Sequence, residues 1–160
     1  MSLKWTKQIY IFFVLFNTAN ILSLAILPDH RAVKLQALSA DNPQMVNGKR
    51  IFNYNCTACH VSNGTGLANM IPVLKGDNGI KGGSSESLTR VLLVGSQGAI
   101  TRFNPTGASM PGFAWKFTNR QAADVLTYIR NEWGNAAPAV SPDEVAKMRE
   151  TLKARKPLGE

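Results

Sequence analysis

Two cysteines and the histidine that follows them carry the clearest chemistry in the sequence. Cys56 and Cys59 are separated by two residues, and His60 comes next. Two thiols at this spacing can add across the two vinyl groups of one haem, and the histidine is then placed beneath the iron as an axial ligand. The chain holds only these two cysteines, so no thiol remains for a structural disulfide. The motif therefore predicts one covalently bound haem c, attached through Cys56 and Cys59 and ligated by His60.

Two other uses of a cysteine pair fit the sequence less well. Structural zinc usually takes four Cys or His ligands, and the only other histidine, His30, lies in a stretch that we interpret as a linker. A thioredoxin-like redox pair belongs beside alternating strands and helices, and we find no such pattern here. Haem attachment remains the prediction.

A second axial ligand is expected among the five methionines of the chain. Met110 is our candidate, because it lies in a glycine-rich loop 50 residues after His60. That length of chain can pass around a haem and return to its opposite face. Met70, on the histidine side, is the alternative. Ligation by His60 and Met110 would fill both axial positions and raise the reduction potential, as suits an electron carrier.

Further predictions concern the surroundings of the haem. A metal-bound histidine usually donates its second ring N–H to an oxygen atom, and the carbonyl of Pro72 is our candidate acceptor. We place Trp115 in the pocket wall, where its N–H, or alternatively Arg102, would meet a propionate. The other candidates for the wall are apolar: Leu74, Phe113 and Phe117.

Helices joined by long loops are expected to position these residues. Side chains that cap helices, a proline at a first helical position and glycine stops predict where the helices begin and end. We expect one helix from Asn42 into the cysteine motif, one from Ser84 or Ser85 to Gly95, and one from Thr118 to about Trp133. Residues 61–83 and 96–117 are interpreted as loops, and we find no convincing strand pattern. The fold class predicted is all-α.

The ends of the chain differ from this central domain, residues 42–134. Lys4 and Lys7 precede an apolar stretch, residues 8–27, which is typical of an export signal or of an uncleaved membrane anchor. Residues 1–27 are therefore interpreted as one or the other, with Ala25 as the cleavage site of a signal peptide. Both alternatives put the rest of the chain in the periplasm.

A linker, residues 28–41, then leads to the central domain. After that domain, residues 135–160 form a tail in which Ser141 and Pro142 can start a short helix. We expect this helix to pack across the surface of the domain.

The net charge is +8, from 18 Lys and Arg against 10 Asp and Glu. Residues 41–134 hold nine basic against five acidic side chains, and no basic run interleaved with aromatic residues occurs. This pattern weighs against a nucleic-acid partner. It fits either ordinary solvated surface charge or a docking patch for an acidic protein.

Over residues 42–134 the sequence resembles class I c-type cytochromes. It is most similar to the haem domains in cytochrome subunits of membrane-bound alcohol, aldehyde and gluconate dehydrogenases. The resemblance rests on Gly48 and Phe52 before the Cys56–His60 motif, on Pro72–Gly76, on Pro105-Thr106 with Met110–Trp115, and on Val125–Asn135.

This resemblance implies a class I cytochrome c fold in which the first and last helices of the domain cross near Gly48, Phe52 and Tyr128. It also implies Met110 as the distal ligand, and delivery of electrons from a dehydrogenase towards a terminal oxidase. Those subunits carry three haem motifs and this chain carries one, which favours a single-haem carrier or a small accessory subunit. We expect no enzymatic activity of its own. The alternative is a haem-based ligand sensor or catalytic haem protein with an open sixth site.

Overall fold

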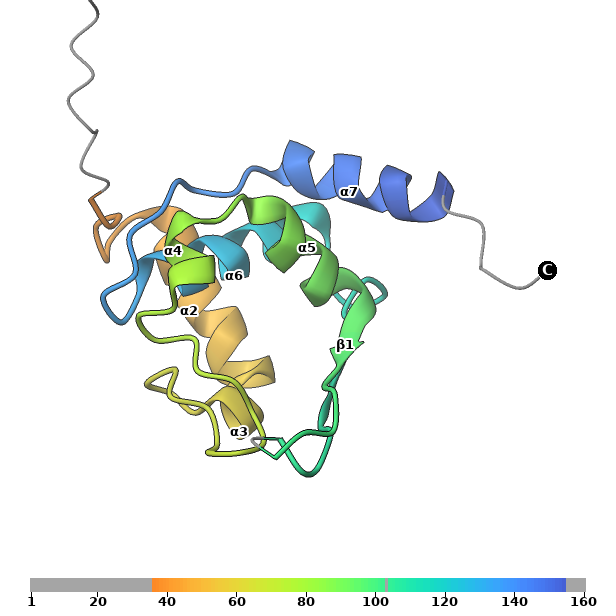
Figure 1. Ribbon diagram of the computed structural model, residues 1–160. Coiled ribbons are helices and arrows are strands. Elements are labelled where there is room, and N and C mark those ends of the chain that lie inside the picture. Colours follow the sequence, from red (N-terminus) through yellow and green to blue (C-terminus); the bar gives the residue numbers. More distant parts are fainter. Residues whose placement is uncertain (1–35, 103, 155–160) are drawn as a thin grey trace, which may run out of the picture. The chain divides into compact units, whose positions relative to one another are not determined.

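The computed structural model describes residues 36–102 and 104–154 (Figure 1). The predicted export or anchor segment, residues 1–27, and residues 28–35 of the predicted linker lie outside these described residues. The elements are α2 (Pro43–Asn55), α3 (Thr57–His60), α4 (Asn78–Gly82), α5 (Ser85–Val94), β1 (Gly95–Gln97), β2 (Ser109–Pro111), α6 (Asn119–Asn131) and α7 (Pro142–Ala154). Among the described residues, no helix is both long enough and apolar enough to cross a bilayer.

The helix starts expected from the sequence are present. The side chain of Asn42 accepts a hydrogen bond from the backbone N–H of Gln44 at 2.9 Å and so caps α2. Thr118 and Gln121 bond reciprocally at the start of α6, the side chain of each accepting from the backbone N–H of the other. Each such cap satisfies backbone donors that the first helical turn leaves free. Ser84 precedes α5, and Gly95 ends it with a φ of 82°.

The crossing of α2 and α6 forms the centre of the core. Gly48 lies against the backbone of Asp124, and a Cβ added to it would stand 2.6 Å from the Cβ of Tyr128. Only glycine allows the two helices to approach so closely. Phe52 is fully buried beside this contact, with its ring centroid 5.5 Å from that of Tyr128 and 5.1 Å from that of Trp133. Burial of a side chain this size contributes about 1.5–3 kcal/mol.

The C-terminal helix expected after Ser141 is α7, which packs against α5 and α6 (Figure 1). Val145 and Met148 on its inner face are buried in the same apolar core as α2 and α6. At its start, Glu144 accepts a hydrogen bond from the hydroxyl of Ser85 at 2.6 Å. The helix is therefore held against the rest of the domain by both packing and polar contacts.

The predicted all-α class is confirmed as a mostly helical fold, with one addition. β1 and β2 form an antiparallel ribbon in which Ser96 is paired with Met110. Each strand has only three residues, too few to show an alternating pattern in the sequence. The short helix α4 likewise lies inside the stretch that we expected to be a loop.

Candidate cofactor site

A cavity of about 570 Å³ lies between α3 and the β1–β2 ribbon, which face each other across the lower part of Figure 1. Its volume falls within the range of about 300–1,000 Å³ found for small-molecule and cofactor pockets. Most of its lining is apolar and comes from the 69–77 loop, from Ile80 and from α5. Five of the six predicted site residues line it: Cys56, Cys59, His60, Pro72 and Met110.

The two thiols come from the junction of α2 with α3, where Cys56 lies, and from α3 itself, which contains Cys59. The backbone N–H of Cys56 donates to the carbonyl of Phe52 at 2.8 Å and so completes the last turn of α2. The carbonyl of Cys56 accepts a hydrogen bond from the N–H of His60 at 2.9 Å. Cys56 is buried, Cys59 is exposed, and neither is in a disulfide. Burial raises the pKa of the Cys56 thiol to about 11. Both sulfurs and the imidazole thus reach the cavity from one short segment.

The imidazole of His60 has an unsatisfied nitrogen. Its Nδ1 atom is buried and has no hydrogen-bond partner. Burial lowers the pKa of His60, while the backbone carbonyl of Pro72 acts in the opposite direction. The lowered pKa favours the neutral imidazole, which is the form that binds metals. The Pro72 carbonyl is near enough to affect the ring but makes no hydrogen bond with Nδ1, so its expected role as acceptor stays a prediction.

The loop that carries Pro72 is held in place by the backbone. The carbonyl of Gly64 accepts from the N–H groups of Leu74 and Lys75 at 2.8 and 3.0 Å. Gly66 has a φ of 63°, and a Cβ added there would stand 2.6 Å from the Pro72 carbonyl oxygen. A side chain at residue 66 would displace the carbonyl that faces the imidazole.

Two residues after α6 support the same loop, and our sequence predictions assigned them no role. Trp133 donates from Nε1 to the carbonyl of Ser62 at 3.2 Å, and Gly64 lies directly under its ring. Asn135 donates from Nδ2 to the carbonyls of Leu74 and Ile129 at 3.0 and 2.8 Å. The stretch Val125–Asn135 pointed to them only through the resemblance, because the loop carbonyls that they bind, those of Ser62 and Leu74, lie far away in the sequence.

Met110 occupies the opposite wall, on β2. Its strand is paired with β1, and the next residues are bonded to α5: Phe113 donates to the Leu92 carbonyl at 2.9 Å, and Ala114 to the Leu93 carbonyl at 3.1 Å. Gly112 fits between them, since a Cβ there would stand 2.7 Å from the carbonyl oxygen of Leu93. The position of Met110 is thus fixed on both sides.

Met70 also lines the cavity, although it is 42% exposed. It lies in the loop that begins at His60, where the N–H of Gly66 bonds back to the His60 carbonyl. Met70 and His60 therefore belong to the same segment, whereas Met110 comes from a different one. This arrangement favours Met110 as the ligand opposite the histidine.

The structure does not place Trp115 with the other predicted site residues. Its side chain is 84% exposed and does not line the cavity. Of the remaining wall candidates, Leu74 and Phe113 line the cavity, whereas Phe117 is buried in the core. Arg102 is exposed and does not line the cavity either. The propionate contact predicted for Trp115 or Arg102 has no support in this arrangement.

The donor set fits a haem. Two thiols, one imidazole with a buried nitrogen and one thioether face an apolar space, and these are the groups that attach haem and fill both axial positions of its iron. In the described part of the chain, no three His, Cys, Asp or Glu side chains come together as a group that could hold a metal ion.

Comparison with known proteins points to the same chemistry. Residues 45–133 match the family model of cytochrome c. The matched stretch includes the cysteine motif, Met110 and the crossing of α2 with α6, and it ends before α7.

The curated relatives include subunits of dehydrogenases. The chain is 34% identical over 105 residues to the cytochrome c subunit of alcohol dehydrogenase (quinone) from Gluconobacter oxydans (strain 621H), a match that covers 65% of this chain and 22% of that protein. It is 35% identical over 114 residues to the gluconate 2-dehydrogenase cytochrome c subunit from Pantoea cypripedii. This match covers 67% of this chain and 25% of that protein. The chain thus spans about a quarter of the length of these relatives. Cytochrome c6 from Thermosynechococcus vestitus (strain NIES-2133 / IAM M-273 / BP-1) is 28% identical over 96 residues, a match that covers 60% of this chain and 74% of that protein.

Proposed function

The chain belongs to the cytochrome c family, and we propose that this electron carrier takes single electrons from a dehydrogenase and delivers them to a terminal oxidase in the periplasm. The family and the Cys56–Cys59 pair together imply a covalent haem c. When bound, that group supplies reversible one-electron chemistry at its iron. The protein's part is to hold it, to orient it and to keep its surroundings apolar.

The observation that carries the proposal is that His60 and Met110 line one cavity from two independently fixed segments. Cys56 and Cys59 would tether the haem, and the imidazole and thioether would ligate its iron on opposite faces. Ligation by both side chains would leave the iron no open position for a substrate, which suits a carrier more than a sensor or a catalyst.

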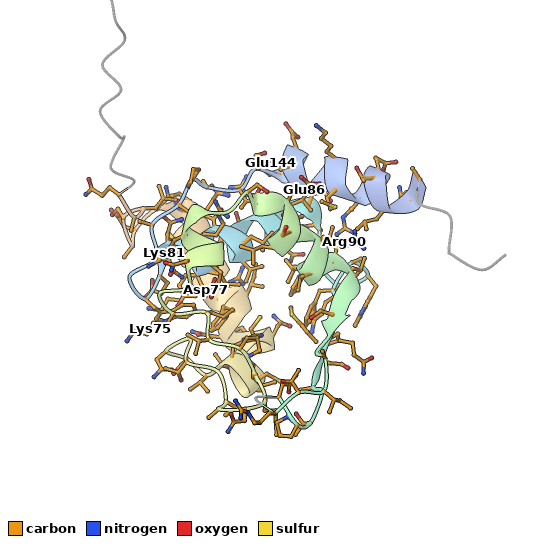
Figure 2. All side chains as sticks on the ribbon, in the orientation of Figure 1. Lys75, Asp77, Lys81, Glu86, Arg90 and Glu144 are labelled. Atoms are coloured by element: carbon orange, nitrogen blue, oxygen red, sulfur yellow. The ribbon has the colours of Figure 1, made fainter. Side chains whose placement is uncertain are left out.

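The proposed partners rest on the relatives and on surface charge. Two of the relatives are subunits of an alcohol and a gluconate dehydrogenase. Lys75, which projects away from the domain in Figure 2, and Lys116 are exposed on the two loops that flank the cavity. Exposed lysines there would steer an acidic partner towards the haem, mainly by raising the association rate.

The proposed location rests on residues 1–27, which lie outside the described residues. If they act as a signal peptide, the mature protein lacks them and is soluble in the periplasm. If they act as an anchor, residues 8–27 hold the domain at the inner membrane. Mass spectrometry of the mature protein, purified separately from the periplasmic and the membrane fraction, distinguishes the two.

The central test measures electron transfer directly. Purified oxidised holoprotein is mixed with membranes that contain an alcohol or gluconate dehydrogenase and its substrate, and haem reduction is followed by absorbance. Reoxidation is then followed with membranes that contain a terminal oxidase. We expect both reactions, with a reduction rate that falls as salt rises, because salt screens steering over ~8 Å at physiological ionic strength. The midpoint potential should barely change with salt.

Charge variants make this test specific. Lys75→Gln and Lys116→Gln should lower the rate at low salt and weaken its salt dependence, whereas Lys153→Gln, on α7, is the matched control. A haem reduction rate that does not change with salt would contradict the proposed electrostatic steering. Steady oxidation of an alcohol by the purified chain alone would contradict the carrier function itself.

A further inference from the structure

Arg149 on α7 makes three hydrogen bonds to one short segment. Its Nη2 atom donates to the carbonyl of Phe117 at 2.6 Å, Nη1 to the carbonyl of Ala114 at 2.8 Å, and Nε to Oδ1 of Asn119 at 2.8 Å. A guanidinium is suited to this because its donors are fixed in one plane and stay charged. One side chain therefore fixes the whole segment 114–119 to α7.

That segment is the continuation of the Met110 strand. Phe113 lines the cavity and stacks on Phe117, with ring centroids 5.1 Å apart and planes inclined by 8°. The carbonyls that Arg149 binds belong to Phe117 itself and to Ala114, the residue after Phe113. Arg149 therefore holds the segment that directly continues the strand carrying Met110.

Helix α7, which carries Arg149, is itself firmly packed against the domain. Val145 and Met148 bury the inner face of α7 in the core. Glu144 bonds Ser85 at the start of α5, and Figure 2 shows Glu144 where α7 begins. The other end of α5 carries the carbonyls of Leu92 and Leu93, which bond the residues that follow Met110. α7 thus braces the Met110 strand directly through Arg149 and indirectly through α5.

We propose that Arg149 is a positioning residue for the methionine ligand: it holds the 114–119 segment so that Met110 stays at the cavity and resists exchange for a ligand from solution. This inference rests on the proposed function, in which Met110 is the sixth ligand. The role of Arg149 is mechanical, since it contacts the backbone beyond Met110 and not the methionine.

The experiment follows the binding of imidazole to the ferric holoprotein by stopped-flow absorbance. Imidazole can enter only when Met110 leaves, so its rate reports opening of the sixth site. Arg149→Met should raise this rate by roughly tenfold or more, because the loss of hydrogen bonds to a charged donor is worth at least about that factor. Arg149→Lys keeps the charge but has a single ammonium group in place of the planar set of donors. Its imidazole-binding rate should therefore lie between those of the wild-type protein and Arg149→Met.

Two controls separate positioning from general effects. Lys147→Met removes a positive charge from the same helix without touching the 114–119 segment, and it should leave the imidazole rate unchanged. Val140→Ala creates a core cavity elsewhere and should lower the unfolding free energy without accelerating imidazole binding. If Val140→Ala accelerates binding as much as Arg149→Met does, or if Arg149→Met leaves the rate unchanged, the inference is wrong.

The far-red absorbance band of methionine bound to ferric iron keeps the two proposals apart. A wild-type holoprotein that shows the band, combined with an Arg149→Met variant of unchanged imidazole rate, overturns only the role of Arg149. A wild-type protein without the band overturns the ligand assignment of Met110 and the positioning role together.

Discussion

Gly48 and Tyr128, which are 80 residues apart in the sequence, approach so closely that a Cβ on Gly48 would stand 2.6 Å from the Cβ of Tyr128. This contact sets the distance between α2, which leads into the cysteine motif, and α6, which is followed by the Trp133 that supports the loop carrying Pro72. The geometry of the histidine side of the cavity therefore depends on a residue that does not line it.

Gly48→Ala should destabilise the holoprotein by about 1–3 kcal/mol, because overpacking at this contact forces the helices apart. Guanidinium unfolding of the holoprotein measures the change. Gly82→Ala is the matched control, since a Cβ at Gly82 meets nothing within 4 Å, and it should be neutral or slightly stabilising. Equal effects of the two substitutions would mean that the crossing tolerates a wider separation.

Cys59→Ala should leave a single thioether and sharply reduce the yield of mature holoprotein. The Cys56→Ala/Cys59→Ala double variant should carry no haem that survives denaturation. Mass spectrometry of the denatured protein measures the covalent haem. Ala58→Ser, an exposed change between the cysteines, should load normally. Normal covalent loading of the double variant would contradict the attachment site.

Met110→Ala should open the sixth position, so that cyanide, imidazole and carbon monoxide bind readily. The midpoint potential should fall, because a thioether ligand favours the reduced iron. Absorbance titration and redox potentiometry measure the two effects. Met70→Ala is the control, since Met70 lines the same cavity from the histidine side. The ligand assignment is wrong if Met70→Ala gives this phenotype and Met110→Ala does not.

Glu144 should make α7 stability depend on pH. Its carboxylate accepts hydrogen bonds from the Ser85 hydroxyl and the backbone N–H of Ser141, which lower its pKa below the ordinary 4.5. A lowered pKa in the folded state stabilises the protein above pH 4.5, and this contribution is lost as the pH falls through the folded value.

Glu144→Gln should therefore cost about 1 kcal/mol near neutral pH, as the loss of a helix cap does, and the cost should vanish in acid. Unfolding of both proteins at several pH values measures the difference. Glu150→Gln, which removes an exposed carboxylate paired with Lys153, should cost little at any pH. A cost of Glu144→Gln that is the same at pH 3 and pH 7 would show that the charge is not involved.

The sequence predicts this structure best where the determining contacts are local. The start of α2 and the Thr118–Gln121 box follow from neighbouring residues, as does the paired presentation of Cys56 and Cys59. Contacts between distant residues were not predictable: nothing near Arg149 indicates that it binds Phe117, and no alternating pattern marks the ribbon that carries Met110. Trp115, which is 84% exposed and does not line the cavity, shows a related limit. An aromatic residue beside apolar neighbours resembles pocket lining, although here the backbone turns its side chain to solvent.

The hydrogen bonds from Trp133 to Ser62 and from Asn135 to Leu74 have a consequence for the order of folding. Each joins residues more than 60 positions apart, and long-range contacts of this kind form late because a large loop must close first. Until the residues after α6 dock, the segment after His60 has only its own backbone hydrogen bonds and lacks the two that join it to the C-terminal part of the domain. We therefore expect the Cys56 thiol, which is buried in the folded protein, to stay accessible until then, which leaves time for haem attachment.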